Sequence, residues 1–309
     1  MSYEPRRTPW HEDVAIRGLR HRLTWWGERS PDPIVLLHGF QDCGMTWQFL
    51  VDCLPASWTL VAPDWRGFGD SEWAPGGYWF PDYLADLEAL LDRLTPNHRA
   101  RVVGHSMGAN VAQMYGGIRP QRLQWLANLE GLGLVNADPD EAPARYATWL
   151  DELRAPLREG TYESTEQLSS VLRRRNPRLT PERAQFIAEA WSRPTAAPGT
   201  EVRLRFDPRH RHVNPVLYRR EEARACWSRF EIPVLLVMGE LSGHRTRHLA
   251  HGGDEQLHAL LKRLQIVTIP GVGHMMHHED PQAVARHIIE FERTQAIPSP
   301  TRSQGSRKT

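Results

Sequence analysis

The chain has 309 residues, of which 40% are apolar and 24% are charged. Its 38 Lys and Arg against 37 Asp and Glu leave a formal net charge of +1. This balance gives no support to a nucleic-acid-binding protein, because that class needs a strongly basic face. No run of eighteen apolar residues is present, so we expect no membrane-spanning helix. The basic N-terminal stretch is not followed by an apolar segment, so we expect no secretory signal.

The cysteines indicate the redox compartment. Cys43, Cys53 and Cys226 are odd in number and contain no C-x-x-C pair. This usage favours free thiols in a reducing compartment over a disulfide framework or a structural zinc site. We therefore expect a cytoplasmic protein.

Short β-rich segments alternate with helical segments along most of the chain, a pattern typical of a mostly parallel sheet covered by helices. Several segments are continuous apolar runs, as expected of strands buried on both faces. In chain order, the expected strands are Asp13–Arg17, Leu19–Trp26, Ile34–Leu37, Thr59–Ala62, Arg101–Val103, Leu126–Leu129, Val234–Met238 and Gln265–Ile269.

Three helices are predicted between these strands. Tyr83–Leu94 carries apolar residues at helical spacing, with Asp82 as the expected N-cap. Met107–Ile118 and Pro281–Arg293 are the other two.

Residues 136–228 interrupt the alternation, so we interpret them as a helical cap inserted between two parts of the core, residues 1–135 and 229–296. The segment has helical patches at Ala144–Leu153, Thr165–Arg174 and Thr180–Trp191, many prolines and no convincing buried strand. Residues 171–220 contain twelve Arg and four acidic residues. This excess indicates either a solvated basic face or a site for an anionic substrate tail. Residues 297–309 are polar and are expected to be a disordered tail.

The motif with the clearest chemistry is Gly104-His105-Ser106-Met107-Gly108, which fits G-x-S-x-G between a predicted strand and a predicted helix. Serine becomes a nucleophile only when a base takes its proton, so its hydroxyl must project from a sharp turn. Glycines on both sides permit that turn, because a Cβ there would crowd the neighbouring backbone. We therefore predict Ser106 as a nucleophile.

Two further segments resemble the α/β-hydrolase family, and the resemblance covers roughly residues 15–295. His38-Gly39-Phe40 matches the family's HG-x segment, and residues 64–71 (DWRGFGDS) look like its D-x-R-G-x-G-x-S loop. The resemblance implies an eight-stranded, mostly parallel sheet flanked by helices, with the cap inserted after the sixth strand. It also implies an oxyanion hole formed by the N–H groups of Phe40 and Met107. His38 and His105 are expected to be hydrogen-bonded packing groups.

The expected base is His274. Gly271-Val272-Gly273-His274 follows the last predicted strand and matches the family's G-x-x-H position. His277 and His278 lie close by, and such a cluster also suggests metal binding. A metal site needs converging ligands, and no acidic or Cys partner appears at a suitable spacing. We therefore expect neither a metal nor a cofactor.

The acid that orients the base is displaced from its usual place. The common family position corresponds to Ser242, which is not an acid. Some related haloalkane dehalogenases carry the acid after the preceding strand, which corresponds here to Glu130. A carboxylate at the end of an apolar strand needs a partner, and a cationic His is suitable. We predict Glu130, with Glu240 or Asp138 as alternatives.

The cap residues 173–191 (RRRNPRLTPERAQFIAEAW) resemble those of a serine hydrolase-like branch of the family, but this resemblance names no substrate. Ser106, His274 and Glu130 together predict a carboxylic ester hydrolase that acts on a small acyl substrate. Because position 106 is Ser, the carboxylate-nucleophile mechanism of dehalogenases and epoxide hydrolases is not expected. An acyl-CoA thioesterase, a C–C bond or lactone hydrolase, and a catalytically silent ligand-binding protein remain alternatives. A scaffolding role would leave Ser106 and His274 unexplained. Four tryptophans are candidates for an apolar substrate wall or for simple packing: Trp47, Trp65, Trp73 and Trp79.

Overall fold

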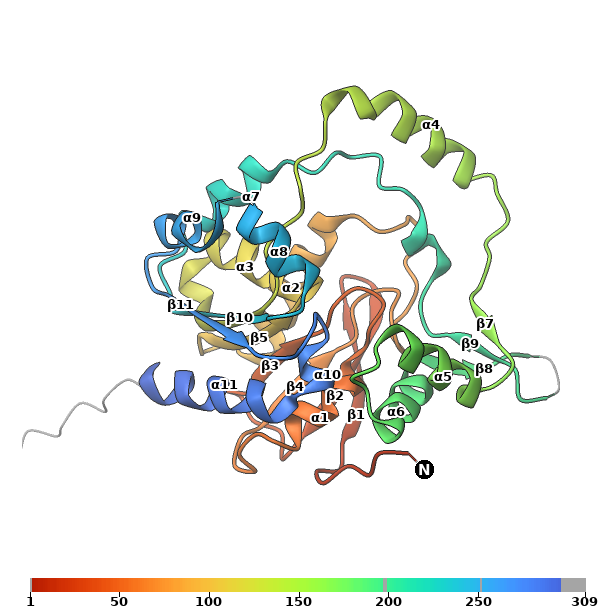
Figure 1. Ribbon diagram of the computed structural model, residues 1–309, viewed down its shortest axis with the longest axis horizontal. Coiled ribbons are helices and arrows are strands. Elements are labelled where there is room, and N and C mark those ends of the chain that lie inside the picture. Colours follow the sequence, from red (N-terminus) through yellow and green to blue (C-terminus); the bar gives the residue numbers. More distant parts are fainter. Residues whose placement is uncertain (1, 197–198, 251, 296–309) are drawn as a thin grey trace, which may run out of the picture.

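A computed structural model describes residues 2–196, 199–250 and 252–295. The central element is one eight-stranded sheet with strand order β1-β2-β4-β3-β5-β6-β10-β11 (Figure 1). β1 and β2 pair antiparallel, and β3, β4, β5, β6, β10 and β11 run parallel. The strands are β1 (Trp10–Ile16), β2 (Leu19–Trp26), β3 (Ile34–Leu37), β4 (Leu60–Pro63), β5 (Ala100–His105), β6 (Leu123–Leu129), β10 (Val234–Gly239) and β11 (Leu264–Ile269).

Helices cover both faces of this sheet, because successive strand residues point to opposite sides. Val102 and Val103 of β5 are both fully buried, yet each belongs to a different apolar cluster. One cluster includes α2 (Phe80–Leu94), α3 (Met107–Ile118), α7 (Arg220–Trp227) and α9 (Gly253–Leu260). The other includes α1 (Gln48–Val51), α10 (Met276–Glu279) and α11 (Pro281–Gln295). Continuous apolar strands therefore form the middle of three layers.

The predicted fold class is confirmed: the sheet has eight strands, is mostly parallel and is flanked by helices, with the insertion after β6. Every predicted core strand and helix is present within a few residues of its expected ends. One detail was wrong. Asp82 is not an N-cap, because α2 begins earlier, after Trp79, and has Pro81 in its first turn. Proline fits there because the first helical N–H groups have no intrahelical partner.

The inserted segment contains more than the predicted helices. Besides α4 (Ala142–Glu152), α5 (Thr165–Arg175) and α6 (Pro181–Trp191), it holds a three-stranded antiparallel sheet. Its strands are β7 (Thr161–Tyr162), β8 (Ser192–Pro194) and β9 (Val202–Leu204). Strands of two or three residues are too short to give a periodic pattern, which is why they were missed.

The middle and the C-terminal end of the inserted segment pack against different parts of the molecule. α5 and α6 form an apolar cluster of their own that contacts Phe49 of α1. α7, which lies inside residues 136–228, instead contributes Ala223 and Trp227 to the main core beside α3. We therefore propose that the cap ends before α7.

Cap and core are joined by polar contacts at the turn between α5 and α6. The Glu279 side chain accepts hydrogen bonds from Asn176 (2.8 Å) and Arg178, and from the Gly273 N–H (2.7 Å). Arg183 donates to the carbonyl oxygens of His278 and Glu279. Part of the basic excess of the cap is thus used to fasten it to the loop that carries His274.

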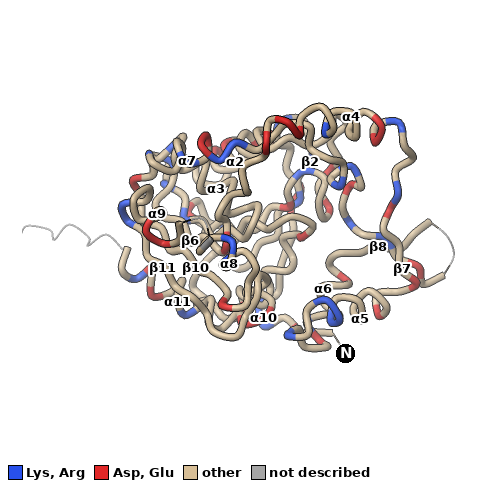
Figure 2. The backbone as a smooth tube through the Cα atoms, turned by 45° about the horizontal axis from the view of Figure 1, so that its top comes forward, with Lys and Arg blue, Asp and Glu red and all other residues tan. Residues whose placement is uncertain are grey.

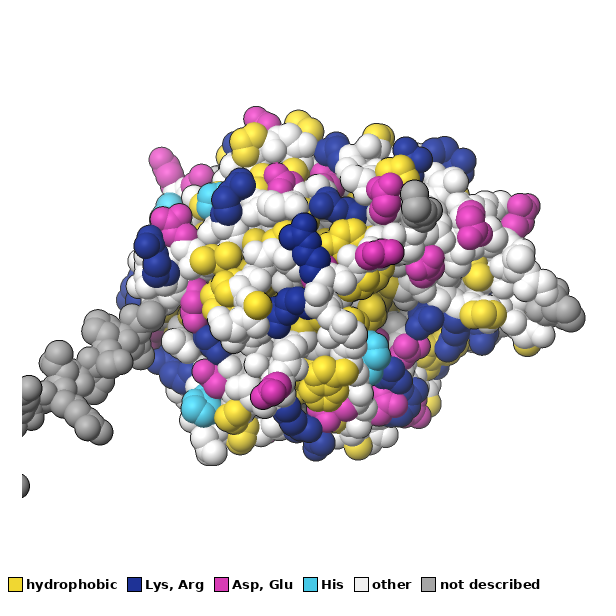
Figure 3. Space-filling view, turned by 90° about the horizontal axis from the view of Figure 1, so that it is seen from below, with side chains coloured by type: hydrophobic (Ala, Val, Ile, Leu, Met, Phe, Trp, Pro, Cys, Tyr) yellow, Lys and Arg dark blue, Asp and Glu magenta, His cyan; other side chains and the backbone are white. Residues whose placement is uncertain are grey.

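Within the described ranges, no helix is long and apolar enough to cross a membrane. Acidic and basic residues are interleaved along the backbone in Figure 2, and Figure 3 shows one face on which basic, acidic and apolar side chains lie side by side. The predicted disordered tail, residues 297–309, lies outside the described residues.

Candidate active site

Ser106 occupies the sharp turn between β5 and α3. Its backbone has φ 49° and ψ −110°, a conformation that non-glycine residues rarely adopt. The predicted crowding at the flanking glycines is present: a Cβ on Gly104 would lie 2.7 Å from the backbone of Ala109, and one on Gly108 would lie 2.3 Å from the Leu37 carbonyl oxygen. The sequence therefore folds into a turn that carries the Ser106 side chain out of the strand.

Backbone donors surround this turn. The first α3 hydrogen bond runs from the Asn110 N–H to the Ser106 carbonyl at 2.9 Å, so the N–H groups that precede Asn110 have no partner within the helix. Phe40 lies on the loop after β3 and is half exposed, and the next residue, Gln41, has φ 59°. The loop after β3 and the start of α3 are therefore the segments that could supply N–H groups to a developing oxyanion.

Glu130 and His274 are in direct contact although 144 positions separate them in the chain. His274 Nδ1 lies 2.6 Å from Glu130 Oε2. The Glu130 side chain is fully buried, whereas that of His274 is 27% exposed. Glu130 also has a positive φ of 58°, the third such non-glycine residue around this site after Gln41 and Ser106. A buried carboxylate on Nδ1 fixes the imidazole tautomer and leaves Nε2 free to accept a proton.

Two groups hold the Glu130 carboxylate in place, one at the end of the neighbouring strand β10 and one on the loop that follows it. The Gly239 N–H donates to Oε1 at 2.7 Å, and the Ser242 hydroxyl donates to Oε2 at 2.7 Å. Ser242, which stands at the usual family position of the acid, thus contacts the acid supplied by β6. The alternative acids are engaged elsewhere: Glu240 accepts from the Gly271 N–H, and Asp138 caps a short 3-10 turn at residues 139–141.

His38 and His105 are buried and hydrogen-bonded, as the motifs predicted. His38 Nε2 accepts from the Trp65 N–H at 3.0 Å while Nδ1 donates to the Gly39 carbonyl, and burial lowers the pKa of His38 to about 4. His105 Nε2 donates to the His274 carbonyl at 3.0 Å, and burial lowers its pKa well below the ordinary value. Both imidazoles are therefore neutral, and their hydrogen bonds fix the backbone of Trp65 and of His274.

A second histidine–carboxylate cluster, missed by the sequence analysis, lies behind His105. Asp42 Oδ2 is 3.6 Å from His277 Nε2 and 3.8 Å from His278 Nε2, and all three side chains are buried. The sequence analysis found no acidic partner for these histidines, and that inference was wrong. Asp42 comes from the loop after β3, so only the tertiary structure brings it near. The one sequence signal that could have indicated this contact is the aspartate that stands two residues after the His38-Gly39-Phe40 segment.

This cluster is the one place among the described residues where His, Cys, Asp or Glu ligand atoms gather closely enough to suggest a metal. Atoms of Asp42, His105 and His277 all lie within 4.8 Å of one another. Zinc–ligand distances near 2.1 Å place ligand atoms roughly 3.4 Å apart, and Asp42 Oδ2 lies 3.6 Å from His277 Nε2. Burial alone raises the pKa of Asp42, but the two imidazoles outweigh it and hold that pKa well below its usual range. A carboxylate whose Oδ1 accepts three hydrogen bonds and whose Oδ2 faces two imidazoles accounts for the arrangement.

The four candidate tryptophans divide into two pairs. Trp47 and Trp65 are fully buried in the core, where Trp47 packs against His277 and Trp65 against His38, so neither forms a substrate wall. Trp73 and Trp79 are half-buried and face the inserted segment: Arg193 lies over the Trp73 ring, and Trp79 contacts Trp149.

Known proteins resemble this chain over most of its length, in sequence and in fold. The model of the alpha/beta hydrolase family matches residues 34–287, so the chain belongs to that family. A serine hydrolase-like protein from Danio rerio is 27% identical, with 97% of this chain and 91% of the relative covered. A 3-hydroxybutyrate-oligomer hydrolase from Cupriavidus necator is 28% identical, with coverages of 92% and 97%. The thioesterase domain from the curacin biosynthetic pathway superposes with a TM-score of 0.81 at 25% identity, over 92% of this chain and 99% of that domain.

Proposed function

We propose that this protein is a serine hydrolase that cleaves a carboxylic ester through an acyl-enzyme on Ser106. The observation that carries the proposal is the 2.6 Å contact between His274 Nδ1 and a fully buried Glu130. A buried carboxylate that fixes a partly exposed imidazole, together with a serine on a strained turn, provides the groups that activate a serine hydroxyl.

In the first half of the reaction, His274 Nε2 takes the proton of Ser106 as Oγ attacks the ester carbonyl carbon. The resulting oxyanion is stabilised by the N–H groups of Phe40 and Met107, each worth on the order of 3 kcal/mol. The tetrahedral intermediate collapses, the C–O bond to the alcohol breaks, and His274 returns its proton to the departing alcohol. The acyl group remains on Ser106 Oγ.

In the second half, His274 takes a proton from water, whose oxygen attacks the acyl-enzyme carbonyl. The second tetrahedral intermediate releases the carboxylic acid, and the proton on His274 returns to Ser106. Throughout, the Glu130 carboxylate stabilises the imidazolium without accepting its proton. Atoms balance as ester plus water giving acid plus alcohol.

The relatives support ester chemistry. The Cupriavidus necator relative is a hydrolase of 3-hydroxybutyrate oligomers, which are esters, and it aligns over 92% of this chain. Thioester hydrolysis is the second candidate, because the curacin thioesterase domain is 25% identical over 92% of the chain. The same three residues would perform both reactions, with a thiol in place of the alcohol. We place the substrate between core and cap.

The first test is the rate of hydrolysis of p-nitrophenyl esters from acetyl to palmitoyl, together with labelling by a fluorophosphonate. We expect turnover and labelling by the natural chain, and loss of both in Ser106→Ala, with kcat lower by about 10³-fold or more. Ser170→Ala, at an exposed serine of α5, is the matched control and should behave as the natural chain does. A chain that hydrolyses no ester or thioester and resists the label would contradict the proposal.

A further inference from the structure

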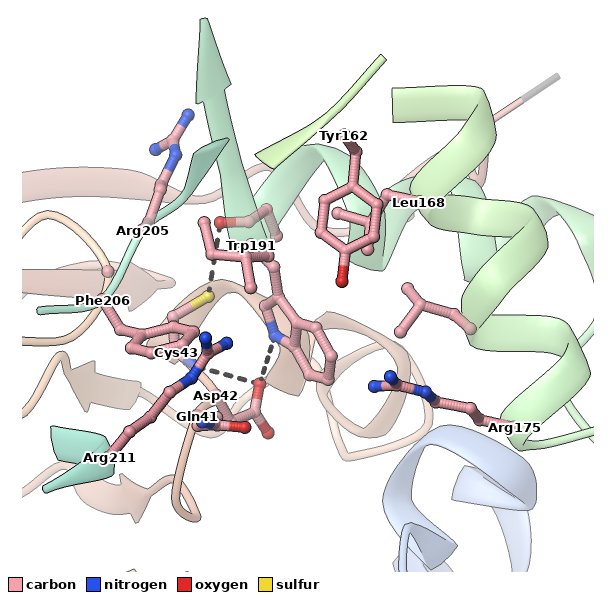
Figure 4. A pocket seen from close by; sticks show the side chains of 14 residues that line it. Gln41, Asp42, Cys43, Tyr162, Leu168, Arg175, Trp191, Arg205, Phe206 and Arg211 are labelled. Atoms are coloured by element: carbon pink, nitrogen blue, oxygen red, sulfur yellow. Dashed lines mark hydrogen bonds between the residues drawn. The ribbon is translucent and has the colours of Figure 1, made fainter. Parts of the chain in front are cut away.

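A cavity of about 110 Å³ lies between the cap and the loop after β3, one residue from Phe40 (Figure 4). Its core side is formed by Gln41, Asp42 and Cys43, and its cap side by residues of α5, α6 and β9 and the segment after β9. Drug-sized ligands occupy larger pockets, so this volume suits one end of a substrate and not a whole molecule.

Three arginines line this cavity, and they differ in their partners. Arg205 is engaged: it donates to both oxygens of Asp70, at 3.0 and 3.1 Å, and to the Ser192 carbonyl. Arg175 and Arg211 have no acidic partner among the described residues, and the Arg211 guanidinium lies over the Phe206 ring, 4.8 Å from its centroid. Figure 4 shows both of their guanidinium groups directed into the cavity from opposite sides, with the Tyr162 hydroxyl pointing toward the same space.

The one acid that lines the cavity does not neutralise these arginines. Asp42 Oδ1 accepts hydrogen bonds from the Cys43 N–H, the Thr46 hydroxyl and the Trp191 indole, at 2.6 to 2.8 Å. Its Oδ2 faces His277 and His278. The cavity therefore keeps two uncompensated cations beside a hydroxyl donor, which is the chemistry that binds an oxyanion.

The rest of the basic excess of the cap has other uses. Arg178 binds Glu279, Arg203 binds Glu159, and Arg209 binds Asp207. Arg183 and Arg220 bind carbonyl groups. Arg173 and Arg174 of α5 are exposed, as are Arg175 and Arg211, but Arg173 and Arg174 do not line the cavity. Arg175 and Arg211 are thus distinguished by position as well as by lack of an acidic partner.

We propose that this cavity binds an anionic group on the acyl part of the substrate, so that the enzyme prefers esters of dicarboxylic or otherwise acidic acyl chains. The inference rests on the proposed function, because it assigns to a cavity on the loop that carries Phe40 one end of the substrate attacked by Ser106. Leu168, Leu172 and Leu204 form apolar walls, which suit the methylene chain between the anion and the ester. A carboxylate and a phosphate share the required chemistry, and the test separates them.

The test compares p-nitrophenyl hydrogen adipate, which has a free carboxylate, with p-nitrophenyl hexanoate, which has the same chain length and no charge. We expect a higher kcat/KM for the acidic ester, lowered by added salt. Arg175→Gln and Arg211→Gln should each raise KM for the acidic ester by about 10- to 100-fold and leave the neutral ester unchanged. Arg173→Gln, on the same helix but outside the cavity, is the matched control and should retain the preference.

A second pair of substrates tests for phosphate binding. Hexanoyl-CoA carries phosphates, whereas the hexanoyl thioester of N-acetylcysteamine has the same acyl chain and no phosphate. An arginine-dependent preference for the CoA thioester alone would assign the cavity to phosphate. Calorimetric binding of adipate to Ser106→Ala tests the cavity without any catalysis. Turnover of neutral esters with no preference for acidic ones, and no arginine-dependent adipate binding, would overturn this inference while leaving the proposed function intact. Absence of labelling at Ser106 in the natural chain would overturn the proposed function and the ester preference with it, whereas adipate binding reports on the cavity separately.

Discussion

Two histidine–carboxylate contacts lie on opposite sides of His105, and they differ in exposure and in distance. On one side, His274 is partly exposed and lies 2.6 Å from Glu130. On the other, His277 is fully buried and lies 3.6 Å from Asp42. The His105 ring contacts both imidazoles, at centroid distances of 4.6 Å to His274 and 4.3 Å to His277.

The difference shows how residue types that look alike in the sequence acquire different tasks. An imidazole that is open to solvent and anchored through Nδ1 can exchange protons with a substrate. The His277 imidazole is buried away from solvent, and its neighbour Asp42 also accepts three hydrogen bonds, so we assign this pair to the stability of the fold. We therefore expect changes in the first pair to alter rate, and changes in the second to alter stability.

The largest expected effect is on rate in Glu130→Gln. The amide keeps the size of the side chain but cannot stabilise an imidazolium and favours the wrong tautomer, so kcat should fall by about 10³- to 10⁴-fold. The free energy of unfolding should fall by only about 1–3 kcal/mol, because the amide keeps one of the two acceptor oxygens that Gly239 and Ser242 bind. Steady-state kinetics and urea denaturation of the same preparation check both parts. A variant of near-natural activity would show that Glu130 is not the acid.

Asp42→Ala should have the opposite profile. It removes the acceptor of three buried donors and the partner of a buried imidazole, so we expect a loss of about 3–5 kcal/mol in the free energy of unfolding. Asp42→Asn retains an acceptor oxygen and should lose less. Both variants, when folded, should keep kcat on a neutral ester within about tenfold of the natural value. A large fall in kcat at unchanged stability would place Asp42 in the chemistry.

A smaller effect on kcat is expected when the carboxylate is moved from position 130 to position 242. Because the Ser242 hydroxyl is 2.7 Å from Glu130 Oε2, a carboxylate at position 242 can approach His274. Glu130→Ala combined with Ser242→Asp should therefore regain about 10- to 100-fold of the kcat lost in Glu130→Ala alone. Ester hydrolysis by the two variants measures this directly. Equal rates would mean that the loop after β10 cannot present an acid to His274.

The buried histidine His38 should make the free energy of unfolding depend on pH in the acid range. Burial lowers the pKa of His38 from the ordinary 6.5 to about 4, so between these values the unfolded chain binds a proton that the folded chain does not. The free energy of unfolding should therefore fall as pH drops from 6.5 to 4, by about 1 kcal/mol per pH unit for this histidine. Urea denaturation at several pH values measures the slope. His38→Asn should flatten it by one proton's contribution, and an unchanged slope would exclude His38 as its source.

Much of the fold could be predicted from sequence, because its signals are local. Continuous apolar runs such as Ile34–Leu37 and Val234–Gly239 indicate strands buried on both faces, and the Gly pair around Ser106 indicates the turn. The cap strands escaped because two or three residues carry no period. Trp47 and Trp65 could not be assigned to core or wall, because a tryptophan has the same local signature in either place.

The sequence by itself determined the family, the three layers, and Ser106, His274 and Glu130 as the residues to examine, since each stands at the end of a recognisable strand or in a motif. The tertiary structure alone decided which histidines meet which carboxylates. It paired Ser242 with Glu130 and sealed Asp42 between His277 and His278, and it left Arg175 and Arg211 facing one cavity. These contacts join segments up to 236 positions apart, and their energies depend on burial and distance, which no local pattern encodes.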